Sequence, residues 1–223
     1  MALNLLFPQR CVGCGNEGSF ICYPCLRALP RVMPPLCPKC GRPEPSGILC
    51  PRCVSWQAEI NGIRSPFRFD GVMRQAIHQL KYENLRALAV LLAQLLNDYL
   101  ITYPIPGEVI IPVPLHWKRL KERGYNQSRL LANELGKLTK LPVVDDCLIR
   151  QHHTPPQART ATVDERYRNV ANAFTCYDQR LQGKQVLLID DVSTSGATLN
   201  ACAVALKAAG ATSVWGLVLA REI

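Results

Sequence analysis

The chain has 223 residues, a formal net charge of +9 at pH 7 and 48% hydrophobic residues. This length suits one α/β domain with a small appendage, and the excess of Lys and Arg favours anionic partners such as nucleic acid or polyphosphates. No apolar run is long enough to span a bilayer, and Cys11 follows the N-terminus too closely for a signal peptide, so we expect a cytoplasmic protein.

Cysteine is concentrated near the N-terminus, which points to a metal-binding module. Each Cys-x2-Cys pair places two thiolates on one tight turn, and two such pairs complete a tetrahedral zinc site. In a cytosolic protein zinc is favoured over disulfides, and this segment has too little apolar content to fold without such support. We predict a double zinc ribbon over residues 1–57, with two zinc ions held by Cys11, Cys14, Cys22, Cys25, Cys37, Cys40, Cys50 and Cys53.

The assignment of these cysteines to the two metals has two alternatives. Sequential pairing places the first two pairs on one zinc, whereas a cross-braced arrangement joins the first pair to the third and the second to the fourth. The similar intervals of seven and nine residues favour sequential pairing. The role of the module is also open between docking of nucleic acid or protein and a purely structural cap.

Residues 58–107 are expected to bridge the module and the core. The pattern predicts a strand over residues 63–69 and helical periodicity from Met73 to about Tyr99, with a break near Asn84. His78 and Lys81 lie near one another at helical spacing. They either face a phosphate or form the polar face of the helix.

The core domain is predicted over residues 108–223 and begins with a strand at residues 109–113. A basic run follows this strand, and guanidinium groups suit phosphate oxygens. The alternative is a solvated basic helix that begins after Leu115. The candidates for pyrophosphate or DNA binding here are Pro114, Leu115, Lys118, Arg119, Arg123, Asn126 and Gln127.

A helix is expected over residues 130–138, then a strand around Arg150 and a polar, proline-containing loop. The loop histidines His152 and His153 are interpreted as solvent-exposed, because neither an acidic side chain nor a thiol lies near them in the sequence. The three remaining cysteines, Cys147, Cys176 and Cys202, are interpreted as small core residues. A last strand is predicted over residues 213–220.

The most informative segment is residues 186–198. Four apolar residues predict a buried parallel strand that ends at Asp190 and Asp191, and helical spacing starts after Thr198. Between them lies a hydroxyl-rich loop, which faces free backbone N–H groups and the positive end of a helix dipole. The loop is therefore expected to hold a phosphate and the acid pair a ribose. The alternative is an acidic strand end before an ordinary capped helix.

This segment resembles the signature of type I phosphoribosyltransferases, whose ligand is phosphoribosyl pyrophosphate. The resemblance implies a parallel sheet flanked by helices, with Mg²⁺ bridging the ribose hydroxyls and the pyrophosphate. It also implies that Asp190 and Asp191 bind the ribose hydroxyls at the catalytic centre. The loop would then bind the 5′-phosphate through Val192, Ser193, Thr194, Ser195, Gly196, Ala197 and Thr198.

The whole sequence is similar to the ComF family of late competence proteins, including its GntX-like members. The shared features are the Cys-x2-Cys module, the Pro-Leu turn, the basic run, Arg123-Gly-Tyr-Asn-Gln127 and a hood segment. In the hood the family pattern is matched at Arg150, Gln157, Arg166 and Asn169, and Arg159 is a further candidate for binding pyrophosphate or DNA.

The ComF resemblance implies binding of phosphoribosyl pyrophosphate and single-stranded DNA during DNA uptake in natural transformation, with competence or helicase machinery as partners. The alternative is a salvage or biosynthetic phosphoribosyltransferase of nucleotide metabolism with a structural zinc cap. The acceptor base, and whether the ligand is turned over at all, are open.

Overall fold

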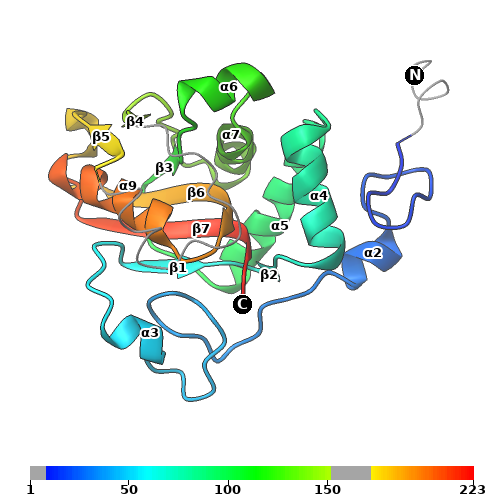
Figure 1. Ribbon diagram of the computed structural model, residues 1–223, viewed down its shortest axis with the longest axis horizontal. Helices are drawn as coiled ribbons and strands as arrows, with labels where there is room; N and C mark the ends of the chain where they lie inside the picture. Colours follow the sequence, from blue (N-terminus) through cyan, green and yellow to red (C-terminus); the bar gives the residue numbers. More distant parts are fainter. Residues whose placement is uncertain (1–8, 152–171) are drawn as a thin grey trace.

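A parallel sheet forms the centre of the computed structural model, which describes residues 9–151 and 172–223 (Figure 1). All its strand pairings are parallel in the described ranges. The helices and sheet confirm the predicted α/β class. The strand order is β1 (Gly62–Arg64), β7 (Ser213–Arg221), β6 (Gln185–Ser193) and β3 (Val109–Pro112), and β2 (Phe67–Arg68) also pairs with β7.

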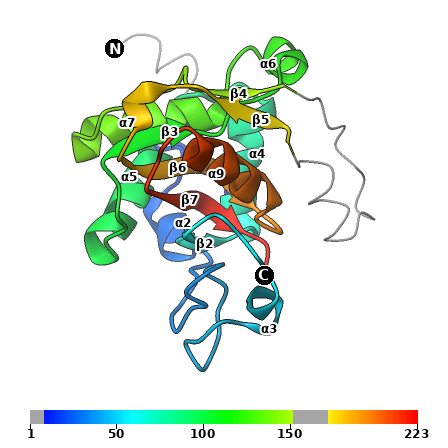
Figure 2. The same ribbon diagram turned by 90° about the vertical axis from the view of Figure 1, so that its left-hand side faces the viewer.

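Helices cover both faces of this sheet. One face carries α4 (Gly71–Tyr82), α5 (Leu88–Thr102) and α7 (Gln127–Thr139), and the other carries α9 (Ala197–Ala208) (Figure 2). Val186 and Leu188 of β6 are buried in the cluster that contains α9 residues, whereas Leu187 and Ile189 are buried against the other three helices. Burial on both faces explains why this strand is apolar without alternation.

The bridging region provides two helices and the edge of the sheet. The expected break separates α4 from α5 at Asn84, whose φ is 56°. The predicted strand over residues 63–69 is interrupted at Ser65, whose hydroxyl donates to the carbonyls of Phe67 and Leu219. The division of the chain into residues 1–57, 58–107 and 108–223 stays a prediction.

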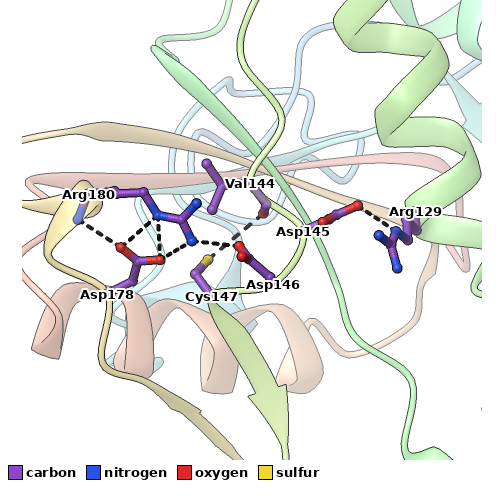
Figure 3. Close-up of polar contacts among 7 residues, drawn as sticks. All are labelled: Arg129, Val144, Asp145, Asp146, Cys147, Asp178 and Arg180. Atoms are coloured by element: carbon purple, nitrogen blue, oxygen red, sulfur yellow. Dashed lines mark hydrogen bonds and ion pairs between the residues drawn. The ribbon is translucent and has the colours of Figure 1, made fainter.

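A smaller antiparallel pair, β4 (Leu148–Arg150) and β5 (Phe174–Cys176), lies beyond β3 and α9. Ion pairs anchor the loop before β4 on both sides (Figure 3). Arg129 of α7 contacts Asp145 at 2.5 Å, and Arg180 of the 3₁₀ helix η1 (Gln179–Leu181) contacts Asp146 at 2.6 Å. Exposed pairs of this kind add little stability, so their effect is to orient the loop.

The cysteine-rich module covers the outer edge of the sheet and contains two short helices, α2 (Tyr23–Arg27) and α3 (Pro51–Val54). Backbone N–H groups of β1 and of Arg68 in β2 donate to the module: Ile63 to the Lys39 carbonyl at 2.8 Å and Arg68 to the Pro30 carbonyl at 2.7 Å. An uncovered edge strand presents unpaired N–H and C=O groups. The module therefore supplies acceptors for these two N–H groups of the edge.

The described part of the chain contains no helix that is both long enough and apolar enough to cross a membrane.

Candidate functional site

The eight N-terminal thiols gather into two groups in sequential order. Within each group, the Sγ atoms lie within 4.8 Å of one another. Four sulfurs bound tetrahedrally at about 2.3 Å from a zinc ion lie about 3.8 Å apart. The Cys40–Cys50 Sγ distance is 3.8 Å and the Cys14–Cys22 distance is 3.5 Å. The geometry fits two zinc sites of four cysteines each, with the sequential grouping that the intervals favoured, and the described cysteines do not form the cross-braced one.

Backbone amides favour ionisation of one thiol in each group. The N–H of Cys22 donates to Cys11 Sγ and that of Cys50 donates to Cys37 Sγ, both at 3.4 Å. Burial opposes ionisation, but such N–H donors outweigh it and lower the pKa of Cys11 and of Cys37 to about 6. Contact with Cys22, followed by burial, raises the pKa of Cys25 to about 12. Four thiolates therefore need the charge of a bound cation to coexist.

Asp190 and Asp191 lie near the carboxyl end of β6, a strand flanked by β3 and β7. Ligands of open α/β sheets bind at this edge. Only 9% of Asp190 and 3% of Asp191 is exposed. Because successive side chains of a strand point to opposite faces, the two carboxylates meet different partners.

Asp190 accepts two hydrogen bonds at one oxygen. The Ser128 hydroxyl donates to Oδ1 at 2.8 Å and the Asp191 N–H donates to the same atom at 2.9 Å. Burial, followed by the charge of Asp191, raises the pKa of Asp190 to about 7, against the smaller opposing effects of Ser128 and Lys81. Near neutral pH this carboxyl group therefore exists in both protonation states.

Asp191 is held by a lysine from α4. The Nζ atom of Lys81 lies 2.5 Å from Asp191 Oδ2, and both side chains are largely buried. Burial, the largest single effect, lowers the pKa of Lys81, but the charge and hydrogen bond of Asp191 together with the charge of Asp190 outweigh it, so the pKa is raised. Lys81 therefore faces the acid pair, whereas His78 is exposed beside Tyr82, with ring centroids 4.8 Å apart. A phosphate contact of Lys81 stays a prediction.

The loop after β6 leads directly into α9. Gly196 is the N-cap residue at φ +85°, and Ser195 Oγ accepts from the Ala197 N–H at 3.3 Å. A Cβ atom at Gly196 would lie 2.8 Å from Ile63 and 3.1 Å from the Trp56 ring. Glycine is therefore required both by the left-handed backbone and by space. The free N–H groups of the first turn of α9 face this loop and suit an anion.

A basic cavity of about 550 Å³ opens beside the acid pair. It carries four cationic side chains and one acidic one, and Lys81 belongs both to this lining and to the ion pair with Asp191. Guanidinium groups are planar and multidentate, so they match phosphate oxygens. The lining residues are Lys81, Tyr82, Asn84, Arg86, Arg119, Glu122, Arg123 and Tyr125.

Only Arg119 and Arg123 of the predicted basic segment line the cavity. Asn126 is instead the N-cap of α7: its side chain accepts from the Ser128 N–H at 3.0 Å and donates to the Val113 carbonyl at 2.9 Å. Gln127 is buried and accepts a hydrogen bond from Arg123. The predicted residues outside the cavity lining are Pro114, Leu115, Lys118, Asn126 and Gln127.

The hood candidates fall mostly outside the described residues. This applies to the predicted ligand Arg159 and also to His152, His153, Gln157, Arg166 and Asn169. Arg150 is described on β4, where burial and then the nearby charge of Arg119 lower its pKa. Its guanidinium lies 5.4 Å from the centroid of the Phe174 ring.

Several residues of the site were not singled out from the sequence. Arg86 lies in the break between α4 and α5, and Asn84 was expected there only as the point where the helical pattern is interrupted. Arg86 packs over the Tyr125 ring at 4.4 Å and Arg123 over Tyr82 at 5.3 Å. Two basic residues, Lys81 and Arg86, flank the break, and this is the one sequence signal that could have indicated the cavity.

A second cavity, of about 460 Å³, is lined by residues of β5 and α9. Its described lining has no charged side chain and includes Phe174, Cys176 and Val204. It also includes Ala197 and Asn200, so it begins beside the anion loop.

Comparison with known proteins gives matches along most of the chain. The double zinc ribbon domain profile matches residues 2–54. Competence protein ComFC of Bacillus subtilis is 30% identical over 91% of this chain and 84% of its own length, and competence protein F of Haemophilus influenzae is 30% identical over 96% and 98%. DNA utilization protein YhgH of Salmonella typhi is 31% identical over 91% of both chains.

A solved structure of glutamine phosphoribosylpyrophosphate amidotransferase from B. subtilis is similar at 21% identity and a TM-score of 0.38. The match covers 60% of this chain and 25% of that one.

Replacement of Asp190 by Asn should remove a pH dependence of folding. An aspartate titrates near 3.9 when unfolded, and burial raises the pKa of Asp190 to about 7 in the folded state. Between these values the folded state binds the extra proton, so the free energy of unfolding falls as pH rises and levels off above about 7. Relative to the original protein, Asp190→Asn should therefore have a higher melting temperature at pH 8 than at pH 5.

Thermal unfolding of zinc-loaded protein measures this difference. The exposed Asp98 provides a matched control, because Asp98→Asn makes the same chemical change away from the site. The quantity to compare is the melting temperature of Asp190→Asn minus that of the original protein. If this difference is smaller at pH 8 than at pH 5, the assignment is contradicted.

Proposed function

The chain belongs to the ComF family, and on that premise we propose that it binds phosphoribosyl pyrophosphate and single-stranded DNA in DNA uptake. Relatives named as competence and DNA utilization proteins support this role. The observation that carries the ligand proposal is the buried acid pair, joined through Lys81 to a basic cavity and followed by an anion loop.

Each part of phosphoribosyl pyrophosphate has a chemically suitable partner. The ribose hydroxyls donate to Asp190 and Asp191, which are acceptors when ionised. The 5′-phosphate takes the loop at residues 193–198, where backbone N–H groups and the dipole of α9 favour an anion. The pyrophosphate takes the basic cavity, which Lys81 joins to the acid pair.

Mg²⁺ suits this site because two adjacent carboxylates offer the hard oxygen ligands that it prefers. Asp190 and Asp191 would hold it, and a bound ion would supply positive charge between the sugar hydroxyls and the pyrophosphate. Lys81 keeps Asp191 in place by its contact at 2.5 Å, and Ser128 orients Asp190. These residues fix the acceptor oxygens before the ligand arrives, which reduces the free energy needed to order the site.

The alternative function is a phosphoribosyltransferase of nucleotide metabolism. The uncharged cavity between β5 and α9 favours it, because this cavity begins beside the loop and suits an uncharged planar group such as a nucleobase. In that reaction the base attacks the anomeric carbon, its bond to pyrophosphate breaks, and the leaving pyrophosphate is stabilised by the cationic cavity. Pyrophosphate release with one defined base would support this alternative. If no base tested led to pyrophosphate release, that result would count against it.

Binding of phosphoribosyl pyrophosphate should depend on Asp191. Asp191→Asn keeps the shape of the side chain but removes the charge that pairs with Lys81 and accepts from a sugar hydroxyl. Loss of a hydrogen bond to a charged group lowers affinity by roughly tenfold or more. Calorimetry with Mg²⁺ present measures this change, with Asp98→Asn as the matched control. Equal affinities of Asp191→Asn and the original protein would contradict the ribose assignment.

Binding of single-stranded DNA should weaken with salt, because phosphate contacts release counterions. If the basic cavity contributes, replacing Arg86, Arg119 and Arg123 together by Gln should reduce the slope of log K against log salt by about 2, from about 0.7 per lost contact. The exposed lysines Lys137, Lys140 and Lys184 provide a control triple of equal charge change.

Fluorescence anisotropy of a labelled oligonucleotide between low and physiological salt gives both slopes. An affinity that stays flat over this range would contradict DNA binding through phosphates. Equal slopes for the two triple variants would instead place the DNA away from the cavity.

A further inference from the structure

We propose that the second zinc site positions the anion loop through Arg42, so that this site, and not the first, controls binding of the 5′-phosphate. The second zinc site is the group Cys37, Cys40, Cys50 and Cys53, all of which are buried. The inference rests on the proposed function, because it concerns the same sugar-phosphate ligand. It assigns a positioning role to a residue of the module that lies far from the loop in sequence.

Arg42 connects the metal turn to the loop. Its Nη2 atom donates to the Thr194 carbonyl at 3.3 Å, across 152 residues of sequence. Its own carbonyl accepts the N–H of Cys37 at 2.8 Å, and the N–H of the preceding Gly41 donates to the Cys37 carbonyl at 2.9 Å. The backbone of Arg42 is therefore fixed by the same turn that presents two of the four thiolates.

Arg221 makes a second connection, on the strand beside the loop. It ends β7, where it is in register with Ser193, and only 2% of it is exposed. Its guanidinium donates to the carbonyl of Cys40. The next residue, Glu222, donates its N–H to the Ser193 carbonyl at 3.0 Å. The start of the loop and the ligand Cys40 are thus held by one strand end.

Trp56 makes a third connection, at the glycine of the loop. It packs against the four cysteines of the second site, shortly after Cys53. Its ring lies 3.1 Å from the position that a Cβ atom of Gly196 would take. The ring therefore packs against the backbone at the point where the chain turns into α9.

The first zinc site packs elsewhere. Val12, Cys25 and Leu26 contact the hydrophobic cluster that includes α4 and α5. A Cβ atom at Gly13 would lie 2.9 Å from Val72. This site is also less enclosed, since Cys14 is exposed while all four cysteines of the second site are buried. The two metals therefore have separable roles, with the second placed against the ligand loop.

The consequence is selective for one part of the ligand. Removing the Arg42 side chain releases the Thr194 carbonyl and loosens the N–H groups that would bind the 5′-phosphate. The basic cavity for pyrophosphate lies on the α4 and α6 (Trp117–Arg123) side and keeps its own cations. Zinc binding also stays intact, because Arg42 contributes no ligand atom to it.

Calorimetry of the full-length, zinc-loaded protein tests this with two probes, ribose 5-phosphate and inorganic pyrophosphate. Arg42→Ala should weaken ribose 5-phosphate binding by about tenfold, the size expected when one hydrogen bond that orders a site is lost. It should leave the pyrophosphate affinity, the melting temperature and the two zinc ions per chain unchanged. Arg42→Lys should recover part of the affinity. Arg31→Ala, a module arginine that packs on Phe67, should bind both probes as the original protein does.

The metal sites are separated by Cys14→Ser and Cys50→Ser, with zinc counted in each. Cys50→Ser should lose ribose 5-phosphate binding and Cys14→Ser should keep it; if Cys50→Ser fails to fold, the Arg42 variants decide. Unchanged ribose 5-phosphate affinity in Arg42→Ala, or an equal loss for both probes, overturns the inference alone. Original protein that binds neither ribose 5-phosphate nor phosphoribosyl pyrophosphate overturns the proposed function, and the inference with it.

Discussion

Two adjacent carboxylates buried at the end of a central strand are the constraint on which the rest of this structure depends. Burial disfavours ionisation, and the neighbouring charge of Asp191 adds repulsion, so the pKa of Asp190 is raised to about 7. Side chains from two neighbouring helices offset this unfavourable free energy by contacting the carboxylates. Lys81 reaches Asp191 from the end of α4, and Ser128 reaches Asp190 from the start of α7. A fold selected only for stability would place apolar residues here, so the pair indicates function.

The other elements of the site are arranged around this pair. The basic cavity lies on the side of Lys81, and the anion loop continues the strand that bears the acids. On the far side of the loop, the second zinc site contacts Thr194 through Arg42 and Gly196 through Trp56. The cysteine-rich module thus contacts both the sheet edge at β1 and the loop after β6.

Local patterns in the sequence were enough to predict most of the fold, whereas contacts between distant segments were not. The apolar run at residues 186–189 and the periodicity broken at Asn84 each depend on neighbouring residues, and both features are present. The sequential grouping of the thiols also followed from short intervals. The basic cavity joins a turn at Arg86 to a helix at Arg119, and only tertiary packing brings such segments together.

The most direct test of the account compares ribose 5-phosphate with 2-deoxyribose 5-phosphate as ligands of the zinc-loaded protein, by calorimetry at pH 8. The two compounds share the phosphate and differ by the 2-hydroxyl, which is one of the sugar hydroxyls whose hydrogen bonds the acid pair is proposed to accept. Because a buried acceptor left without its donor is costly, the account predicts that the deoxy compound binds about tenfold more weakly or worse. Equal affinities would show that Asp190 and Asp191 accept no hydrogen bond from the 2-hydroxyl, and would contradict the account.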